Sequence, residues 1–139
     1  MISMDDCIFC KVIKGEMPSY KVYEDDYVFA FLDIHPINPG HTILVPKTHT
    51  TDMREMDGEI AQHLMSVAQK IAPIIAKQVG TEAFNFTSNI GRAAGQVIFH
   101  THFHIIPRFS TDGYEHWHRD GDVHEDLTEL VEKIRESLE

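Results

Sequence analysis

The chain has few cysteines, few basic residues and no long apolar run, and each shortage excludes a class of protein. Only two of its 139 residues are cysteines, so it is not a disulfide-rich secreted scaffold. No apolar stretch approaches the roughly 18–20 residues that a transmembrane helix needs. Residues 1–19 lack the basic start and apolar centre of a signal peptide. We therefore expect a cytoplasmic protein with no membrane partner.

Basic residues are scarce relative to acidic ones. Lysine and arginine together number 12 against 22 aspartates and glutamates, which gives a formal net charge of −10. Nucleic acid polymers and anionic membranes both favour a basic surface, so neither is an expected partner. A small nucleotide remains compatible with this charge, because backbone N–H groups bind phosphate without a net positive charge.

Hydrophobic periodicity predicts the fold class. Short runs rich in aromatic and β-branched residues predict strands at residues 20–24, 27–32, 41–45, 84–88 and 99–106. Apolar residues three and four positions apart predict a long helix over 57–79 and a C-terminal helix over 123–138, and a short helix is expected at 7–14. Because the strands mostly follow one another, the predicted class is α+β with an antiparallel sheet, one long central helix and a C-terminal helix.

Three of the ten histidines alternate along the chain, at His100, His102 and His104. Alternate residues of a strand share one face, so the three imidazoles are expected to form a row. A neutral imidazole is a nucleophile, a proton carrier and a metal ligand. The spacing alone is therefore compatible with a catalytic row and equally with a three-histidine metal site.

The loop just before the histidines favours phosphate chemistry. Residues 89–96 contain an asparagine, two glycines and small side chains between two predicted strands. Glycines allow the backbone N–H groups of such a loop to approach an anion closely. A close-approach loop placed directly before a row of imidazoles indicates a site for a phosphate group.

The same segments, taken in order, resemble a known family. Residues 100–106 resemble the histidine-triad signature, in which histidines alternate with apolar residues. Residues 7–13 resemble the opening helix of the histidine-triad (HIT) nucleotide-binding family, and residues 31–34 resemble its ribose-binding loop. Residues 39–47 resemble the strand that follows in the family, and residues 89, 95 and 96 resemble its phosphate loop. The match is closest to the Hint branch. It implies a single HIT domain over 1–139, with a core at about 5–110 and a C-terminal tail and helix over 111–139.

The resemblance implies a two-step hydrolysis. The middle histidine, here His102, attacks the α-phosphorus to form a nucleotidyl-histidine, which water then hydrolyses. His104 binds the phosphate and helps proton transfer to the leaving group, while the backbone around His100 is expected to fix the tautomer of His102. The implied substrates are purine nucleoside phosphoramidates of AMP or GMP type. Dinucleoside polyphosphate hydrolysis and a nucleotide-binding module with little turnover are the alternatives; a metal-dependent hydrolase is disfavoured, because the family uses no catalytic metal.

The resemblance also assigns the nucleotide-binding residues by position. Asp33 matches the acid that accepts the ribose hydroxyls, and His41 matches a further histidine beside the triad. Val97 stands where many relatives have a polar side chain, so a hydrogen bond near the scissile bond is lost. The remaining positions around the base and the phosphate are Ile8, Phe9, Val12, Phe31, Ile34, Asn89, Gly95 and Gln96.

Cys7 and Cys10 form a C-x-x-C pair, which supplies half of a tetrahedral zinc site. Family members with this pair hold a structural zinc that two histidines complete, and His49 and His100 match those positions. A redox pair or free thiols are the alternative, although the βαβ context of a thioredoxin motif is missing. The Hint branch also implies a homodimer, in which the C-terminal segment near 116–117 approaches the partner's active site.

Overall fold

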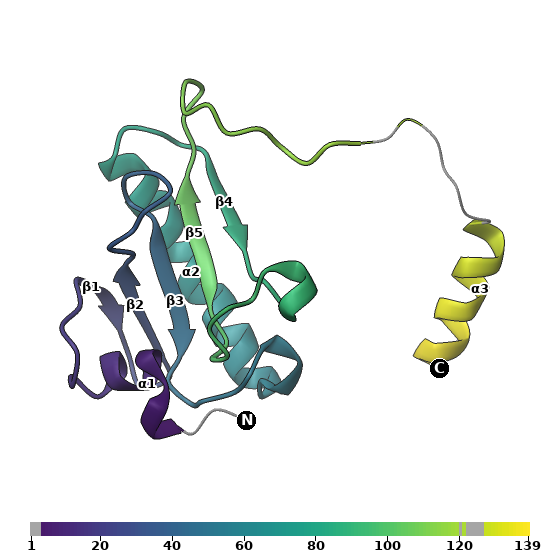
Figure 1. The fold of residues 1–139 in the computed structure, drawn as a ribbon, viewed down its shortest axis with the longest axis horizontal. Helices are drawn as coiled ribbons and strands as arrows, with labels where there is room; N and C mark the ends of the chain where they lie inside the picture. Colours follow the sequence, from purple (N-terminus) through teal and green to yellow (C-terminus); the bar gives the residue numbers. More distant parts are fainter. Residues whose placement is uncertain (1–3, 120, 122–126) are drawn as a thin grey trace.

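The chain folds into a five-stranded antiparallel sheet (Figure 1). The computed structural model describes residues 4–119, 121 and 127–139. The strands lie in the order β1 (Lys21–Glu24), β2 (Val28–Leu32), β3 (Thr42–Pro46), β5 (Phe103–Pro107) and β4 (Phe84–Thr87). Each neighbouring pair is antiparallel, which confirms the predicted α+β class. The strands β1 and β4 form the two edges of the sheet.

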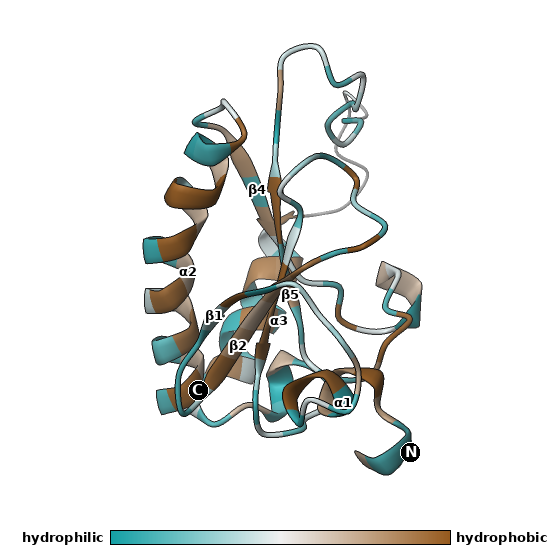
Figure 2. Ribbon diagram, turned by 90° about the vertical axis from the view of Figure 1, so that its left-hand side faces the viewer, coloured by the Kyte–Doolittle hydropathy of each residue, from teal (hydrophilic) through white to brown (hydrophobic). Residues whose placement is uncertain are grey.

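The long helix α2 (Gly58–Gln78) covers one face of the sheet. Asp57 caps its first turn by accepting hydrogen bonds from the N–H groups of Glu59 and Ile60, a cap that contributes about 1 kcal/mol. Figure 2 shows apolar positions of α2 facing the sheet and polar positions facing away. The buried core between helix and sheet consists of Val28, Ala30, Leu44, Leu64, Val67, Ala68, Ile71, Ala72, Ile75 and Ile105.

The short helix α1 (Ile8–Ile13) covers the opposite face. Side chains alternate along β2, so Phe29 and Phe31 join the cluster under α1, while Val28 and Ala30 face α2. Ile43 of β3 belongs to the α1 cluster and pairs in register with His104 of β5. Residues paired across two strands share a face, so His104 lies on the same side of the sheet as α1.

The last strand is shorter than predicted, because β5 begins at Phe103 and residues 99–102 lie outside the sheet. The backbone N–H of Thr101 donates to the carbonyl of Thr50 at 2.8 Å, and their two hydroxyls lie 2.6 Å apart. This segment therefore bonds to the loop after β3 instead of continuing the β-ladder. The expected row of three histidines on one strand is wrong, because only His104 belongs to β5.

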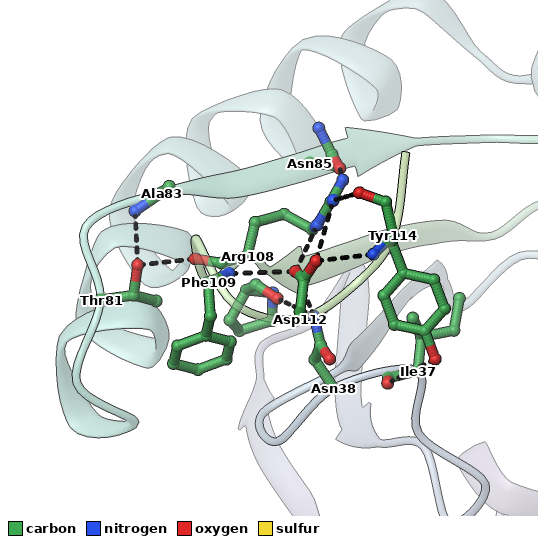
Figure 3. Close-up of polar contacts among 10 residues, drawn as sticks. Ile37, Asn38, Thr81, Ala83, Asn85, Arg108, Phe109, Asp112 and Tyr114 are labelled. Atoms are coloured by element: carbon green, nitrogen blue, oxygen red, sulfur yellow. Dashed lines mark hydrogen bonds and ion pairs between the residues drawn. The ribbon is translucent and has the colours of Figure 1, made fainter. Parts of the chain in front are cut away.

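A buried carboxylate ties the end of β5 to the loop that precedes β3 (Figure 3). Asp112 accepts hydrogen bonds from Asn38 Nδ2 at 3.0 Å, from Arg108 Nε at 2.8 Å, and from Arg108 Nη2. The backbone N–H groups of Phe109 and Tyr114 donate to it as well. These bonds hold the pKa of Asp112 well below its usual range; the pairing with Arg108 has the largest effect, and the two backbone N–H groups add to it. We call residues 38, 108, 112 and 114 the Asp112 cluster.

The C-terminal helix α3 (Leu127–Leu138) stands apart from the sheet (Figure 1). It carries the apolar spacing predicted for residues 123–138, and its apolar side chains are exposed. Residues 123–126 of the predicted helix lie outside the described residues. No helix among the residues that the structure describes is long and apolar enough to span a membrane.

Candidate functional site

His102 lies on the α1 side of the sheet, just before β5, and its side chain is buried. Its Nδ1 lies 2.7 Å from the carbonyl oxygen of His100. A carbonyl only accepts hydrogen bonds, so Nδ1 carries the proton and Nε2 keeps its lone pair. Burial lowers the pKa of His102, which favours the neutral ring. The geometry therefore presents Nε2 as a nucleophilic nitrogen.

Neighbouring elements fix the position of His102. The Phe9 ring of α1 meets the His102 ring edge to face, with centroids 5.1 Å apart. Ser88, which follows β4, donates from Oγ to the His102 carbonyl at 2.7 Å. The His104 ring lies nearly perpendicular to the His102 ring at a centroid distance of 5.1 Å. These contacts hold the ring between the helix and the sheet.

His104 is hydrogen-bonded to a second buried histidine. His104 Nδ1 lies 2.9 Å from His41 Nε2, and the N–H of Ile37 donates to His41 Nδ1 at 3.1 Å. Asp33 Oδ2 lies 3.7 Å from His41 Nε2, and Asp33 Oδ1 accepts the N–H of His35. Burial lowers the pKa of His41, and it lowers the pKa of His104 to about 4. The structure thus brings Asp33, His41 and His104 together, with ligand atoms within 4.8 Å of one another.

Cys7, Cys10, His49 and His100 form a second cluster, and their ligand atoms all lie within 4.8 Å of one another. His100 Nδ1 lies 3.3 Å from the sulfur of Cys7 and 3.1 Å from His49 Nδ1. His49 Nδ1 in turn lies 3.4 Å from the sulfur of Cys10. His100 Nε2 lies 2.9 Å from the carbonyl oxygen of Pro46, so Nε2 carries the proton and Nδ1 presents a lone pair to the cluster. These four side chains could hold a metal ion.

The glycine-rich loop between β4 and β5 is closed by its own hydrogen bonds. Gly95 has φ +94°, and a Cβ there would lie 3.3 Å from Asn89 Nδ2, so glycine suits this position. The side chain of Gln96 is buried; it accepts the N–H of Gly91 and donates to the carbonyls of Thr51 and Ile98. The Gln96 side chain therefore shapes the loop. The side chain of Val97, in contrast, is 81% exposed.

The predicted apolar slot for the base divides into two groups. Phe9, Val12 and Phe31 are buried in the cluster beneath α1. Ile8 and Ile34 are exposed, at 42% and 68% of their surface. The buried three support the site from below, while the exposed two remain available to a ligand.

The HIT domain family model matches residues 14–111. The protein belongs to the HIT domain family. A HIT-like protein of Borreliella burgdorferi is 48% identical over 114 residues, covering 80% of this chain and 81% of that protein. The adenylylsulfatase HINT3 of Arabidopsis thaliana is 44% identical over 108 residues, covering 78% of this chain and 55% of that protein. The adenosine 5'-monophosphoramidase HNT1 of Candida albicans is 34% identical over 144 residues, covering 99% of this chain and 95% of that protein.

Solved structures of other HIT proteins share the fold. The protein SMU.412c of Streptococcus mutans superposes with a TM-score of 0.88 at 39% identity, covering 99% of this chain and 88% of that one. A zinc-bound histidine triad protein of Mycobacterium smegmatis superposes with a TM-score of 0.76 at 35% identity, covering 86% of each chain. The HIT family is therefore shown by sequence and by structure, and the general activity is that of nucleotide binding or hydrolysis.

Several groups that shape the HIT site were missed by motif reasoning. The carbonyl of Pro46 orients His100, the N–H of Ile37 orients His41, and Ser88 holds the backbone of His102. Backbone groups carry no side-chain signal, so no motif could have identified the first two. Asp112 lies after residue 111, where the family match ends, and its contacts depend on the tertiary fold.

Proposed function

We propose that this HIT protein hydrolyses purine nucleoside phosphoramidates of AMP or GMP type through a nucleotidyl intermediate on His102. The observation that carries the proposal is the 2.7 Å hydrogen bond from His102 Nδ1 to the His100 carbonyl, which leaves a lone pair at Nε2. The monophosphoramidase name of the Candida albicans relative supports the substrate class. Covalent catalysis divides one difficult displacement into two easier ones.

The reaction balances with the groups at hand. His102 Nε2 attacks the α-phosphorus, the bond from phosphorus to the leaving nitrogen breaks, and His104 gives that nitrogen a proton. A water molecule then attacks the phosphorus, its proton goes to His104, and the bond from His102 to phosphorus breaks. The cycle returns both imidazoles to their starting states and needs no metal ion at the reacting atoms.

The remaining predicted residues are proposed to bind the nucleotide. Asp33 accepts the ribose hydroxyls, His41 supports His104, and the N–H of Val97 faces the phosphate from the loop that Asn89, Gly95 and Gln96 shape. Among the described residues, no carbonyl accepts a hydrogen bond from that N–H, whereas the N–H groups of Gly95 and Gln96 donate within the loop. The base is proposed to contact Ile8 and Ile34, with Phe9, Val12 and Phe31 beneath.

A substrate panel tests this proposal. Adenosine phosphoramidate is expected to be the best substrate, ahead of diadenosine polyphosphates and adenylyl sulfate, with AMP as the common product. Preferred cleavage of a diadenosine polyphosphate would instead favour the alternative hydrolase, and binding of AMP without turnover of any substrate would favour a nucleotide-binding module. Immediate inhibition by a chelator would indicate a metal-dependent hydrolase.

We propose that the cysteine and histidine cluster holds a structural zinc ion. A tetrahedral zinc with bonds of about 2.3 Å to sulfur and about 2.0 Å to nitrogen places its ligand atoms roughly 3.3–3.8 Å apart. Four of the six separations among the sulfur and nitrogen atoms of Cys7, Cys10, His49 and His100 are 3.1–3.5 Å, close to this geometry, and all six lie within 4.8 Å. When bound, zinc supplies a cross-link between α1, the loop after β3 and the segment before β5, and no catalytic role.

We propose that two copies associate through the β4 edge. Beside it, Met65, Ala68, Gln69, Ala72, Phe84 and Phe86 line an apolar groove of about 370 Å³. An open strand edge next to an apolar groove suits the same surface of a second copy, because a two-fold axis pairs identical patches. Trp117 is 97% exposed and is available to such a partner.

Replacing Met65 by glutamate is expected to convert the dimer to a monomer. The side chain is 55% exposed in the single chain, so the charge disturbs the interface and not the folded core. Ile74 provides a matched control, because it is also 55% exposed but lies on the opposite flank of α2. Light scattering should give the mass of a monomer for Met65→Glu and of a dimer for Ile74→Glu. A monomeric wild type, or a dimeric Met65→Glu, would contradict the assignment.

We also propose that the protein is cytoplasmic. Cys7 and Cys10 are free and buried, and thiolate ligands persist in a reducing compartment. Detection of the tagged protein in a periplasmic or membrane fraction would contradict this location.

A further inference from the structure

The Asp112 cluster fixes the loop that carries Asp33 and His41. Asn38 Nδ2 donates to Asp112 and also to the carbonyl of Pro107 at 2.9 Å (Figure 3). Tyr114 Oη donates to the carbonyl of Ile37 at 3.3 Å. The Ile37–Asn38 segment is therefore held against the end of β5 from two sides.

The rest of the cluster is built to hold this carboxylate in place. Arg108 is anchored by Asn85, since its Nη1 donates to Asn85 Oδ1 at 2.7 Å. Its Nη2 donates to the carbonyl of Tyr114 at 2.7 Å, and the Asp112 side chain is only 5% exposed. A buried carboxylate with this many donors has little freedom to move, so it can transmit its position to Asn38.

The Ile37 N–H decides where the protons of two histidines reside. It donates to His41 Nδ1, which must therefore present a lone pair. A neutral imidazole has one N–H, so the proton of His41 resides on Nε2, which donates to His104 Nδ1 at 2.9 Å. His104 in turn keeps its own proton on Nε2. Within the described chain, His104 Nε2 makes no hydrogen bond, so this N–H can reach a substrate.

We infer that Asp112 is a positioning residue for the active site. Its cluster holds the carbonyl of Ile37 and the side chain of Asn38, and so fixes residue 37 where its N–H sets the tautomers of His41 and His104 and leaves a proton on His104 Nε2. The inference rests on the proposed function for its catalytic meaning, because that proton is the one delivered to the leaving amine. The tautomers themselves follow from the hydrogen bonds alone.

The same bonds disfavour a metal ion at this position. Ligand atoms of Asp33, His41 and His104 lie within 4.8 Å of one another, a spacing that a divalent ion could bridge. A metal ion there would need the lone pair of His41 Nε2, but the Ile37 N–H places the proton on that nitrogen. The group therefore acts as a hydrogen-bond chain.

Nitrogen-15 NMR of the histidine rings tests the inference directly on the unliganded, zinc-loaded wild type. Two-bond couplings distinguish the protonated from the unprotonated nitrogen of each neutral ring. We expect His41 and His104 both to carry the proton on Nε2. A proton on Nδ1 of either ring would overturn the inference, whatever the enzyme hydrolyses.

Variants connect the tautomer to Asp112. Asp112→Asn is expected to give His104 nitrogen signals averaged between the two tautomers. Tyr114→Phe removes one exposed hydroxyl and is expected to shift the His104 signals in the same direction by a smaller amount. Asp25→Asn is the matched control, because Asp25 also accepts several hydrogen bonds but lies in the turn between β1 and β2. If Asp112→Asn and Tyr114→Phe both keep the wild-type tautomer, Asp112 has no positioning role; if Asp112→Asn does not fold, Tyr114→Phe decides.

Kinetics provide a readout that general destabilisation would not reproduce. An amine needs a proton to leave, whereas sulfate leaves without one. Asp112→Asn should therefore lower kcat for adenosine phosphoramidate about tenfold. The kcat for adenylyl sulfate and the KM of both substrates should change little. Equal losses on both substrates would overturn the inference. A wild type that turns over neither substrate would instead contradict the proposed function and leave the NMR result to decide the tautomers.

Discussion

Replacing His102 by alanine is expected to lower the turnover of adenosine phosphoramidate by about 10⁴-fold or more, because the variant has no nucleophile to form the intermediate. His102→Asn is the gentler change, since its amide can still donate to the His100 carbonyl but has no nitrogen at the Nε2 position. Both variants should bind AMP with nearly wild-type affinity. Steady-state kinetics with amine release as the readout, and calorimetry for binding, make the measurement.

His63→Ala is the matched control for this prediction. His63 lies on α2, is partly exposed and bonds to Asp25 in the turn between β1 and β2. The variant should keep wild-type turnover, although it removes an imidazole as well. Wild-type turnover in His102→Ala would show that another group attacks phosphorus.

Removal of zinc is expected to lower the melting temperature by about 10 °C or more. The four ligands come from α1 and its N-cap residue Cys7, from the loop after β3 and from the segment before β5, so a metal ion bound there stabilises only the folded state. Loss of a few kcal/mol corresponds to a shift of this size for a domain of this length. The measurement is calorimetry of protein treated with a strong chelator, and added zinc should restore the original value.

The activity should respond to the chelator slowly, as the apo protein unfolds, and not upon mixing. The double variant Cys7→Ser, Cys10→Ser should purify with less than about 0.1 zinc per chain, against about one for the wild type. Purified wild-type protein that contains no zinc and has two freely titratable thiols would contradict the zinc assignment.

Much of the fold could be predicted from the sequence, because local patterns and the final contacts agree. The unbroken apolar run in residues 28–31 is typical of a strand buried on both faces, and the spacing in residues 60–75 specifies a helix with one apolar side. The start of β5 could not be predicted. Its alternating residues suit a strand from 99 onward, but Thr101 bonds to Thr50, a partner that only the tertiary fold provides.

The candidate site divides in the same way. Residues with distinctive chemistry, such as the alternating histidines and the cysteine pair, were identified by type and spacing, and the family resemblance supplied His49. The family resemblance assigned the tautomer of His102 to the backbone around His100, and the His100 carbonyl does lie at Nδ1 of His102. The partners that set the tautomers of His100 and His41 were not predictable, because they are backbone groups of Pro46 and Ile37. Gln96 was predicted at the phosphate, but its side chain holds the loop together.

The most direct test of the account is to locate the covalent intermediate. Wild-type protein is mixed rapidly with adenosine phosphoramidate, quenched in alkaline denaturant that preserves a phosphorus–imidazole bond, digested and analysed by mass spectrometry. We expect an adenylyl group on His102, formed within the first turnover and absent from His102→Asn. An adduct on any other residue, or full turnover with no adduct at any quench time, would contradict it.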